Sequence, residues 1–397
     1  MLCFEVRILI LMQSRKIDRS ISVSFFNFAK MKNSTINQIT AYLEQLVPLA
    51  SQESYDNCGL LVGDKNTEVT NVLISLDCTE QIVEEAIQKN CQLIISHHPL
   101  LFKGIKKLTG ADYVQRTLIK CIQNNIAIYA IHTNLDNYRF GVNYEISNRL
   151  NLMNAQIVLP KNQSLSKLVT YVPLSHVDEV TNTLFTAGAG RIGNYEECHF
   201  RTVGSGTYKP MEMANPFEGS IEQRSEVEEA KIEFLVENTR VDFIVNQLKL
   251  VHPYEEVAYD VVALQNSNAH EGAGMIGELQ EPMDEIEFIK NVKEIFQCGV
   301  VKYTRLLDQP IKKVAVCGGS GSFLVQQAIA QGADVFVTSD MKYHEFFDAD
   351  DRILILDIGH YESEQYTKHL IADILKKNFT NFAIHLTERN TNPINYW

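Results

Sequence analysis

Short apolar runs alternate with amphipathic stretches along most of this chain. In the first half, continuous runs of strand length and β-branched character occupy 71–77, 92–98 and 126–136. The stretch at 79–90 spaces its apolar residues along one face of a helix. The alternation returns in the second half, at 312–321, 333–340 and 352–364. This order predicts an α/β fold whose sheet contains parallel strands and is covered on both faces.

The pattern changes in the middle of the chain. Glycine-rich turns occupy 186–200 and 204–220, and an acidic stretch and a strand-like segment at 252–264 follow them. We interpret this region as a smaller α+β domain inserted into the first domain. The predicted organisation is therefore a two-half α/β domain, formed by 31–165 and 267–397, with an insertion at 166–266.

Residues 1–30 lack the regular pattern of apolar residues that the rest of the chain has. Their apolar run is short and is interrupted by Glu5 and Arg7, which is unlike a membrane span or a signal peptide. A regular helical pattern begins only at Ile36. We therefore interpret 1–30 as a leader that is dispensable or wrongly included. No other stretch has the pattern of a membrane span, so we expect no membrane partner.

Charge and cysteine usage narrow the classes of function. The 397 residues include 36 basic and 49 acidic ones, for a net charge of −13. This balance disfavours nucleic acid as a partner, although a local phosphate site stays open. The eight cysteines are scattered without a CxxC pair, which is typical of a reduced, cytoplasmic protein.

Histidines gather where the predicted strands end. Five of the eleven lie at or just beyond such an end: His97, His98, His132, His344 and His360. Ligands of open α/β sheets bind outside the carboxyl ends of the strands, so these side chains are expected to converge. His97 and His98 are adjacent, and neighbouring side chains of an extended chain point to opposite sides. The pair therefore suits two neighbouring ions better than one, with an acid/base pair or chance as the alternatives.

Carboxylates complete a candidate metal site. His360 and Glu364 are four residues apart at the start of a helical pattern, which places them on one face. Asp136 ends another predicted strand. Taken singly, Glu364 fits a helix N-terminus and Asp136 fits a turn. Together with the histidine pair they have the nitrogen and oxygen character of a dinuclear divalent-metal site, and they do not distinguish zinc, iron and manganese.

Other candidates lie on nearby loops. Asp340 and His344 are predicted to transfer protons or to orient a substrate, and the alternative for Asp340 is a hydrogen bond to a ligand histidine. We interpret His132 as such a supporting residue too. The glycine-rich stretch 317–322 is either a phosphate-binding turn or simply a tight turn.

Several stretches together resemble the GTP cyclohydrolase I type 2 homologue family, also called the NGG-interacting-factor-three-like family. The resemblance covers 31–397 and rests on ASQESYDNCGLLVGD (50–64), SHHPLLF (96–102), HTNLDN (132–137), VAVCGGSG (314–321), TSDMKYHE (338–345) and DIGHYESE (357–364). It implies two divalent metals bound by His97, His98, Asp136, His360 and Glu364. It also implies a CutA- or PII-like, ferredoxin-like insertion and a homo-oligomer, usually a hexamer. Tyr55 and Met213 depart from the family pattern without touching a metal ligand.

Two functions from different classes follow. The first is a metal-dependent hydrolase acting on a small molecule such as a nucleotide or a phosphoester; the resemblance points to GTP. The second is an oligomeric regulatory protein that senses a metal or a nucleotide without turnover. Metal-dependent turnover that is lost in His97→Ala would separate the first from the second.

Overall fold

The computed structural model describes residues 34–397, so the predicted leader lies outside the described residues. The chain forms two compact units, which are described separately below. Of the described residues, one unit contains 166–262, and the other combines the flanking segments 34–165 and 263–397. Among the described residues, every helix is too short or too polar to cross a bilayer.

The flanking segments build two mixed sheets, where the alternating pattern had predicted one. The first sheet has the strand order β17 (Ala383–Leu386), β4 (Asn71–Ser75), β5 (Leu93–Ser96), β6 (Ala127–Ala130) and β2 (Gly59–Val62). The second has the order β13 (Lys302–Tyr303), β16 (Leu354–Asp357), β15 (Val335–Ser339), β14 (Ile311–Ser320), β12 (Asn268–Met283) and β7 (Met153–Lys161). Each half of the sequence thus supplies the parallel centre of its own sheet.

The parallel centres confirm the expected strands: β14 is shifted by one residue, and the other five are shorter than expected. Strands β4, β5 and β6 pair in parallel, as do β14, β15 and β16. In the first sheet β17 pairs in parallel with β4 and β2 pairs antiparallel with β6, whereas in the second sheet β12 and β13 both pair antiparallel. A small separate ladder joins β1 (Ser34–Thr35) to β3 (Glu68–Val69). Because parallel strands end at the same edge, the residues after β5 and β6 start close together.

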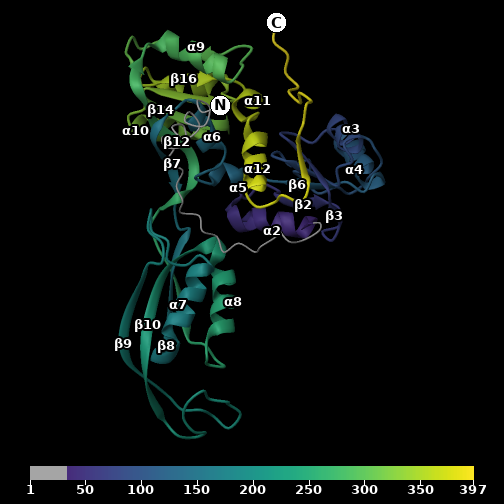
Figure 1. Ribbon diagram of the computed structural model, residues 1–397. Helices are drawn as coiled ribbons and strands as arrows, with labels where there is room; N and C mark the ends of the chain where they lie inside the picture. The colour runs from purple at the N-terminus through teal and green to yellow at the C-terminus, as the bar shows by residue number, and fades with distance from the viewer. Residues whose placement is uncertain (1–33) are drawn as a thin grey trace, which may run out of the picture. The chain divides into compact units, whose positions relative to one another are not determined.

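Helices of this unit lie between and around the two sheets (Figure 1). They are α2 (Ile36–Leu46), α3 (Glu80–Gln88), α4 (Tyr113–Gln123), α5 (Thr133–Asn137), α6 (Val142–Arg149), α9 (Glu285–Ile295), α10 (Val325–Ala330), α11 (His360–Glu364) and α12 (Thr367–Lys376). Thr35 and Gln38 form a capping box at the start of α2, which satisfies amides that have no partner inside the helix. One apolar core contains residues of both sheets, including Ile74 and Tyr129 of the first and Val316 and Leu356 of the second.

The unit formed by 166–262 has its own sheet and its own core. Its elements are β8 (Leu165–Pro173), α7 (Val177–Thr186), β9 (His199–Tyr208), β10 (Ser225–Glu237), α8 (Val241–Val251) and β11 (Tyr259–Ala263). The strand order is β11, β8, β10, β9, and α7 and α8 lie side by side on one face (Figure 1). Apolar residues of β8, β10 and both helices form the separate core. Each unit can therefore bury apolar surface on its own.

Candidate metal centre

The first two histidines of the site follow β5, where the parallel strands end. His97 is fully buried, and its Nδ1 lies 2.8 Å from the carbonyl oxygen of Ile131. A carbonyl oxygen only accepts hydrogen bonds, so Nδ1 carries the hydrogen and Nε2 keeps its lone pair. Burial also lowers the pKa of His97 to about 3, which favours the neutral ring. His97 therefore presents a free nitrogen lone pair to the site.

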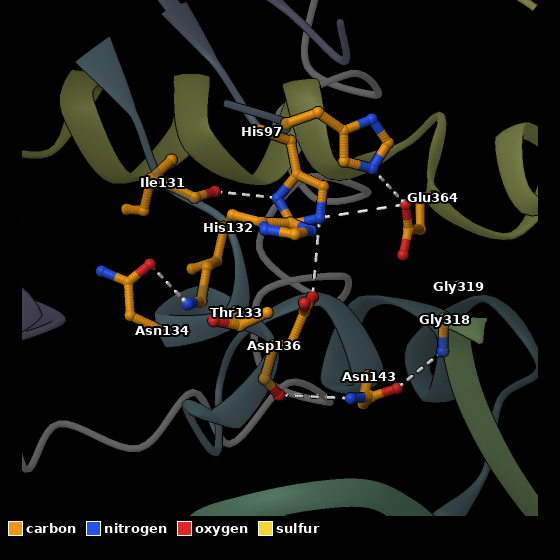
Figure 2. Close-up of polar contacts among 12 residues, drawn as sticks. His97, Ile131, His132, Thr133, Asn134, Asp136, Asn143, Gly318, Gly319 and Glu364 are labelled. Carbon is orange, nitrogen blue, oxygen red and sulfur yellow. Dashed lines mark hydrogen bonds and ion pairs between the residues drawn. The ribbon is translucent and has the colours of Figure 1, made fainter. Parts of the chain in front are cut away.

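The Nε2 of His97 faces two carboxylates. It lies 3.5 Å from Oδ1 of Asp136 and 3.9 Å from Oε2 of Glu364 (Figure 2). Neither this nitrogen nor Oδ1 of Asp136 has a hydrogen-bond partner among the described residues, although both atoms are buried. Buried polar atoms without a partner are rare in folded proteins, and a metal ion between these two atoms would satisfy both.

Glu364 lies at the centre of the remaining imidazoles. Its Oε2 is 3.0 Å from Nε2 of His98 and 3.0 Å from Nε2 of His360, and these two nitrogens are 3.2 Å apart. Burial disfavours a charge on Glu364, but the two histidines outweigh it and hold the pKa of the carboxyl well below its usual range. Glu364 is therefore a carboxylate that all three imidazoles share.

Two other carboxylates orient the rings of His98 and His360 from the side opposite Glu364. Nδ1 of His98 donates to Asp77 at 2.7 Å, and Nδ1 of His360 donates to Asp340 at 2.6 Å. Burial lowers both histidine pKa values, yet the surrounding carboxylates raise the pKa of His98 to about 9 and that of His360 to about 11. A ring fixed through Nδ1 directs Nε2 inward, as in metal sites with a carboxylate behind the histidine.

His132 is a fourth imidazole of the site, and sequence reasoning assigned it only a supporting position. Its Nδ1 donates to the buried carboxylate of Asp56 at 2.9 Å, and its ring centroid lies 5.2 Å from that of His97. It follows β6 as His97 follows β5, so the strand-end pattern that selected His97 also contained the signal for His132.

Three groups of side chains in the described part of the chain can hold a metal ion. Within each group the ligand atoms lie within 4.8 Å of one another: His97, His98 and His132; His98, His360 and Glu364; His97, Asp136 and Glu364. The structure thus brings all five predicted ligands together.

His360 and Glu364 share one face of α11, as their spacing predicted. The prediction of a strand end at Asp136 was wrong, because β6 stops at Ala130 and Asp136 lies on the single turn of α5.

Of the two loop residues predicted to act in catalysis, Asp340 contacts the candidate metal centre and His344 does not. Asp340 contacts His360, and its backbone has the left-handed φ of 56°, which aspartate tolerates better than most residues. His344 is exposed, with ring contacts to Tyr343 and Phe347. None of the contacts found within 34–397 joins His344 to the imidazoles, and its proton-transfer function stays a prediction.

The glycine-rich end of β14 packs against Glu364. The amide of Gly319 donates to the hydroxyl of Ser363 at 3.1 Å. The amide of Gly318 donates to Oδ1 of Asn143 at 2.9 Å (Figure 2). Asn143 in turn donates to the carbonyl of Asp136 at 3.2 Å. These two amides are engaged within the protein, which disfavours the phosphate-binding interpretation. The tight-turn interpretation does not hold for them either, because Gly318 and Gly319 lie within β14, where its pairing with β15 shifts register.

We expect Gly319→Ala to destabilise the protein by displacing Glu364. Gly319 has φ +62°, and a Cβ there would lie 2.5 Å from Oε1 of Glu364. The left-handed conformation alone costs an alanine about 1–2 kcal/mol. Gly332→Ala is the matched control, because Gly332 has φ +73° and open space for a Cβ. Chemical denaturation should show a larger loss of unfolding free energy for Gly319→Ala; equal losses would contradict the steric argument.

Comparison with known proteins gives concordant matches. A family model described as Duf34/NIF3 (NGG1p interacting factor 3) matches residues 34–393. A Staphylococcus epidermidis protein named "GTP cyclohydrolase 1 type 2 homolog" is 36% identical over 366 residues, which are 91% of this chain and 99% of that protein. A relative of the same name from Staphylococcus aureus is 37% identical over the same shares.

Solved structures agree with the sequence matches. The crystal structure of a Bacillus cereus protein related to NIF3 has a TM-score of 0.81 and 36% identity, over 92% of this chain and all of that one. A Staphylococcus aureus structure has a TM-score of 0.72 and 33% identity over the same shares. Both similarities extend over the two units described above.

Proposed function

The chain belongs to the Duf34/NIF3 family, and we propose that it binds two divalent metal ions and uses them to hydrolyse a small-molecule substrate. One ion is held by His97, Asp136 and Glu364, and the other by His98, His360 and Glu364. The observation that carries the proposal is the facing pair of buried, unpartnered atoms, Nε2 of His97 and Oδ1 of Asp136.

The donor atoms suit divalent cations. Neutral imidazole and carboxylate together bind zinc, iron and manganese alike, so the metal is not identified by ligand type. Bound divalent ions supply Lewis-acid chemistry to hydrolytic enzymes. The chain's own residues would supply the surroundings of the ions. Glu364 would offset part of their positive charge, and Asp77, Asp340 and Asp56 hold three of the imidazole rings by Nδ1.

The insertion is part of the proposal as well. We propose that residues 166–266 form a ferredoxin-like domain related to CutA and PII proteins. The order β-α-β-β-α-β and the strand order β11, β8, β10, β9 support this assignment.

Metal binding is expected to release protons at neutral pH. His98 and His360 have pKa values raised to about 9 and about 11, so both rings are protonated near pH 7 before metal binds. Partial burial beside Glu364 also raises the pKa of Asp136, which adds to the protons held. A metal needs the lone pairs, and its affinity should therefore rise with pH. Calorimetry in buffers of different ionisation enthalpy should show net proton release; proton-independent binding would contradict the proposed ligands.

A substrate screen tests the hydrolase function. Protein loaded with the metal that it retains is offered GTP first, because the curated relatives are named for it, and then other nucleotides and phosphoesters. We expect turnover that is lost in His97→Ala and kept in His385→Ala, since His385 lies on β17 and contacts Asn71 instead of the site. Metal binding without any turnover would favour the sensing function instead.

A further inference from the structure

The last stretch of the chain runs past the metal centre. We call residues 387–396 the strap. It continues from β17, which pairs in parallel with β4, and the amide of Thr387 donates to the carbonyl of Ile74 at 2.9 Å. Parallel strands leave a sheet at the same edge, so the strap emerges beside the segment that follows β4. That segment contains Asp77, the hydrogen-bond partner of His98.

Three carboxylates anchor the strap by hydrogen bonds. The hydroxyl of Thr387 donates to Glu85 at 2.5 Å, and that of Thr391 donates to Oδ2 of Asp77 at 2.5 Å. Further along, the hydroxyl of Tyr396 donates to Glu362 at 2.9 Å. The chain separations range from 34 to 314 residues, so these contacts depend on the tertiary fold.

Two of the three anchors adjoin metal ligands. Asp77 uses one oxygen for His98 and the other for Thr391, which leaves its carboxylate little freedom to rotate. Glu362 is buried and lies on α11 between His360 and Glu364. By contrast, Glu85 lies on α3, and its hydrogen bonds to Thr387 and Glu388 involve no histidine.

Near the far end of the strap Tyr396 is 40% exposed, yet its side chain lies against two glycines. A Cβ at Gly299 would lie 2.3 Å from the ring of Tyr396, and a Cβ at Gly359 would lie 3.0 Å from its hydroxyl oxygen. Tyr396 therefore rests directly on backbone at two points. Asn392 donates to the same oxygen of Glu362 at 3.1 Å. Two strap side chains, Asn392 and Tyr396, therefore hold Glu362 by hydrogen bonds. Glu362 lies on α11, the helix that carries two of the proposed ligands.

We propose that the strap positions the metal centre: Thr391 orients Asp77, which in turn orients His98, and Tyr396 fixes α11 through Glu362. The inference rests on the metal binding proposed above and assigns a positioning function to residues that touch no metal ligand themselves. Residues in direct contact with a ligand, as Asp77 is with His98, typically change metal affinity by 10–100-fold, because they set the direction of the ligand's lone pair. Thr391 acts one contact further out, so its effect is expected at the lower end of that range.

The chain offers a matched pair of substitutions as a test. Thr391→Val and Thr387→Val each remove one strap hydroxyl from a carboxylate, but only Asp77 contacts a histidine. We expect Thr391→Val to weaken binding of the retained metal by about 10-fold in a chelator competition. Thr391→Ser, which keeps the hydroxyl, should retain most of the affinity, and Thr387→Val should retain wild-type affinity even if it lowers the melting temperature.

A double-mutant cycle separates positioning from general loosening. If Thr391 acts through Asp77, Thr391→Val should have no further effect on metal affinity in the Asp77→Ala background. Additive losses, or equal losses in Thr387→Val and Thr391→Val, would overturn the inference. Wild-type protein that binds no metal would instead overturn the proposed function. Wild-type binding with unchanged affinity in Thr391→Val would overturn the strap inference alone.

Discussion

Glu364→Ala should abolish retention of both metal ions. Glu364 belongs to two of the three candidate ligand groups, and its Oε2 lies between the Nε2 atoms of His98 and His360. Its loss removes one ligand from each proposed ion and also the charge that offsets two cations. Because supporting residues alone change metal affinity by 10–100-fold, loss of a shared ligand should lower affinity by at least about 100-fold.

Metal content and affinity measured on purified protein check this expectation. Glu285→Ala is the control, because Glu285 is also a buried carboxylate, and it accepts hydrogen bonds from the amides of Leu307 and Asp308 outside the metal centre. We expect Glu285→Ala to lose stability but keep the metal. A Glu364→Ala protein that retains the wild-type metal content would show that the metal is held elsewhere.

Gly141→Ala should destabilise the fold by about 3 kcal/mol, a loss typical of severe overpacking. A Cβ at Gly141 would lie 1.7 Å from the carbonyl oxygen of Leu135 and 2.9 Å from that of Tyr138. Both contacts are with backbone, which a rotamer change cannot relieve. The backbone that must move includes α5, which carries Asp136, so metal affinity should fall together with stability.

Denaturant unfolding of the metal-free protein measures the loss of stability in Gly141→Ala. Gly104→Ala serves as the control, since a Cβ at Gly104 meets nothing within 4 Å. Its free energy of unfolding should stay within about 0.5 kcal/mol of the wild type. Equal stability of the two variants would mean that the turn between α5 and α6 is looser than the structure shows.

Strand ends were the most informative feature of the sequence. A continuous apolar run followed by a polar pair predicts a buried strand that delivers side chains to a sheet edge, and His97 and His98 occupy that place after β5. The four-residue spacing of His360 and Glu364 predicted a shared helical face, which α11 confirms. Asp136 was found for a partly wrong reason, because five residues of helix leave too short a pattern to recognise.

Long-range pairing could not be predicted in the same way. The alternation of strands and helices does not say whether two halves share one sheet, and the structure has two. Strand β17 joins β4 across more than three hundred residues. The hydrogen bond of Asp340 to a ligand histidine was one of two predicted alternatives and is confirmed, with His360 as the histidine. Asp56 and Asp77, in contrast, hold imidazole rings from separate elements, so no local spacing connects either carboxylate with its histidine. Only the tertiary fold shows these partners.

Anomalous diffraction from a crystal of the metal-loaded protein tests the central proposal most directly. Data collected at the absorption edge of the retained metal should give two neighbouring peaks. One is expected beside Nε2 of His97 and Oδ1 of Asp136, the other beside Nε2 of His98 and His360, with Glu364 between them. A fully loaded protein with no peak among these side chains, or with peaks only elsewhere, would contradict the proposed metal centre.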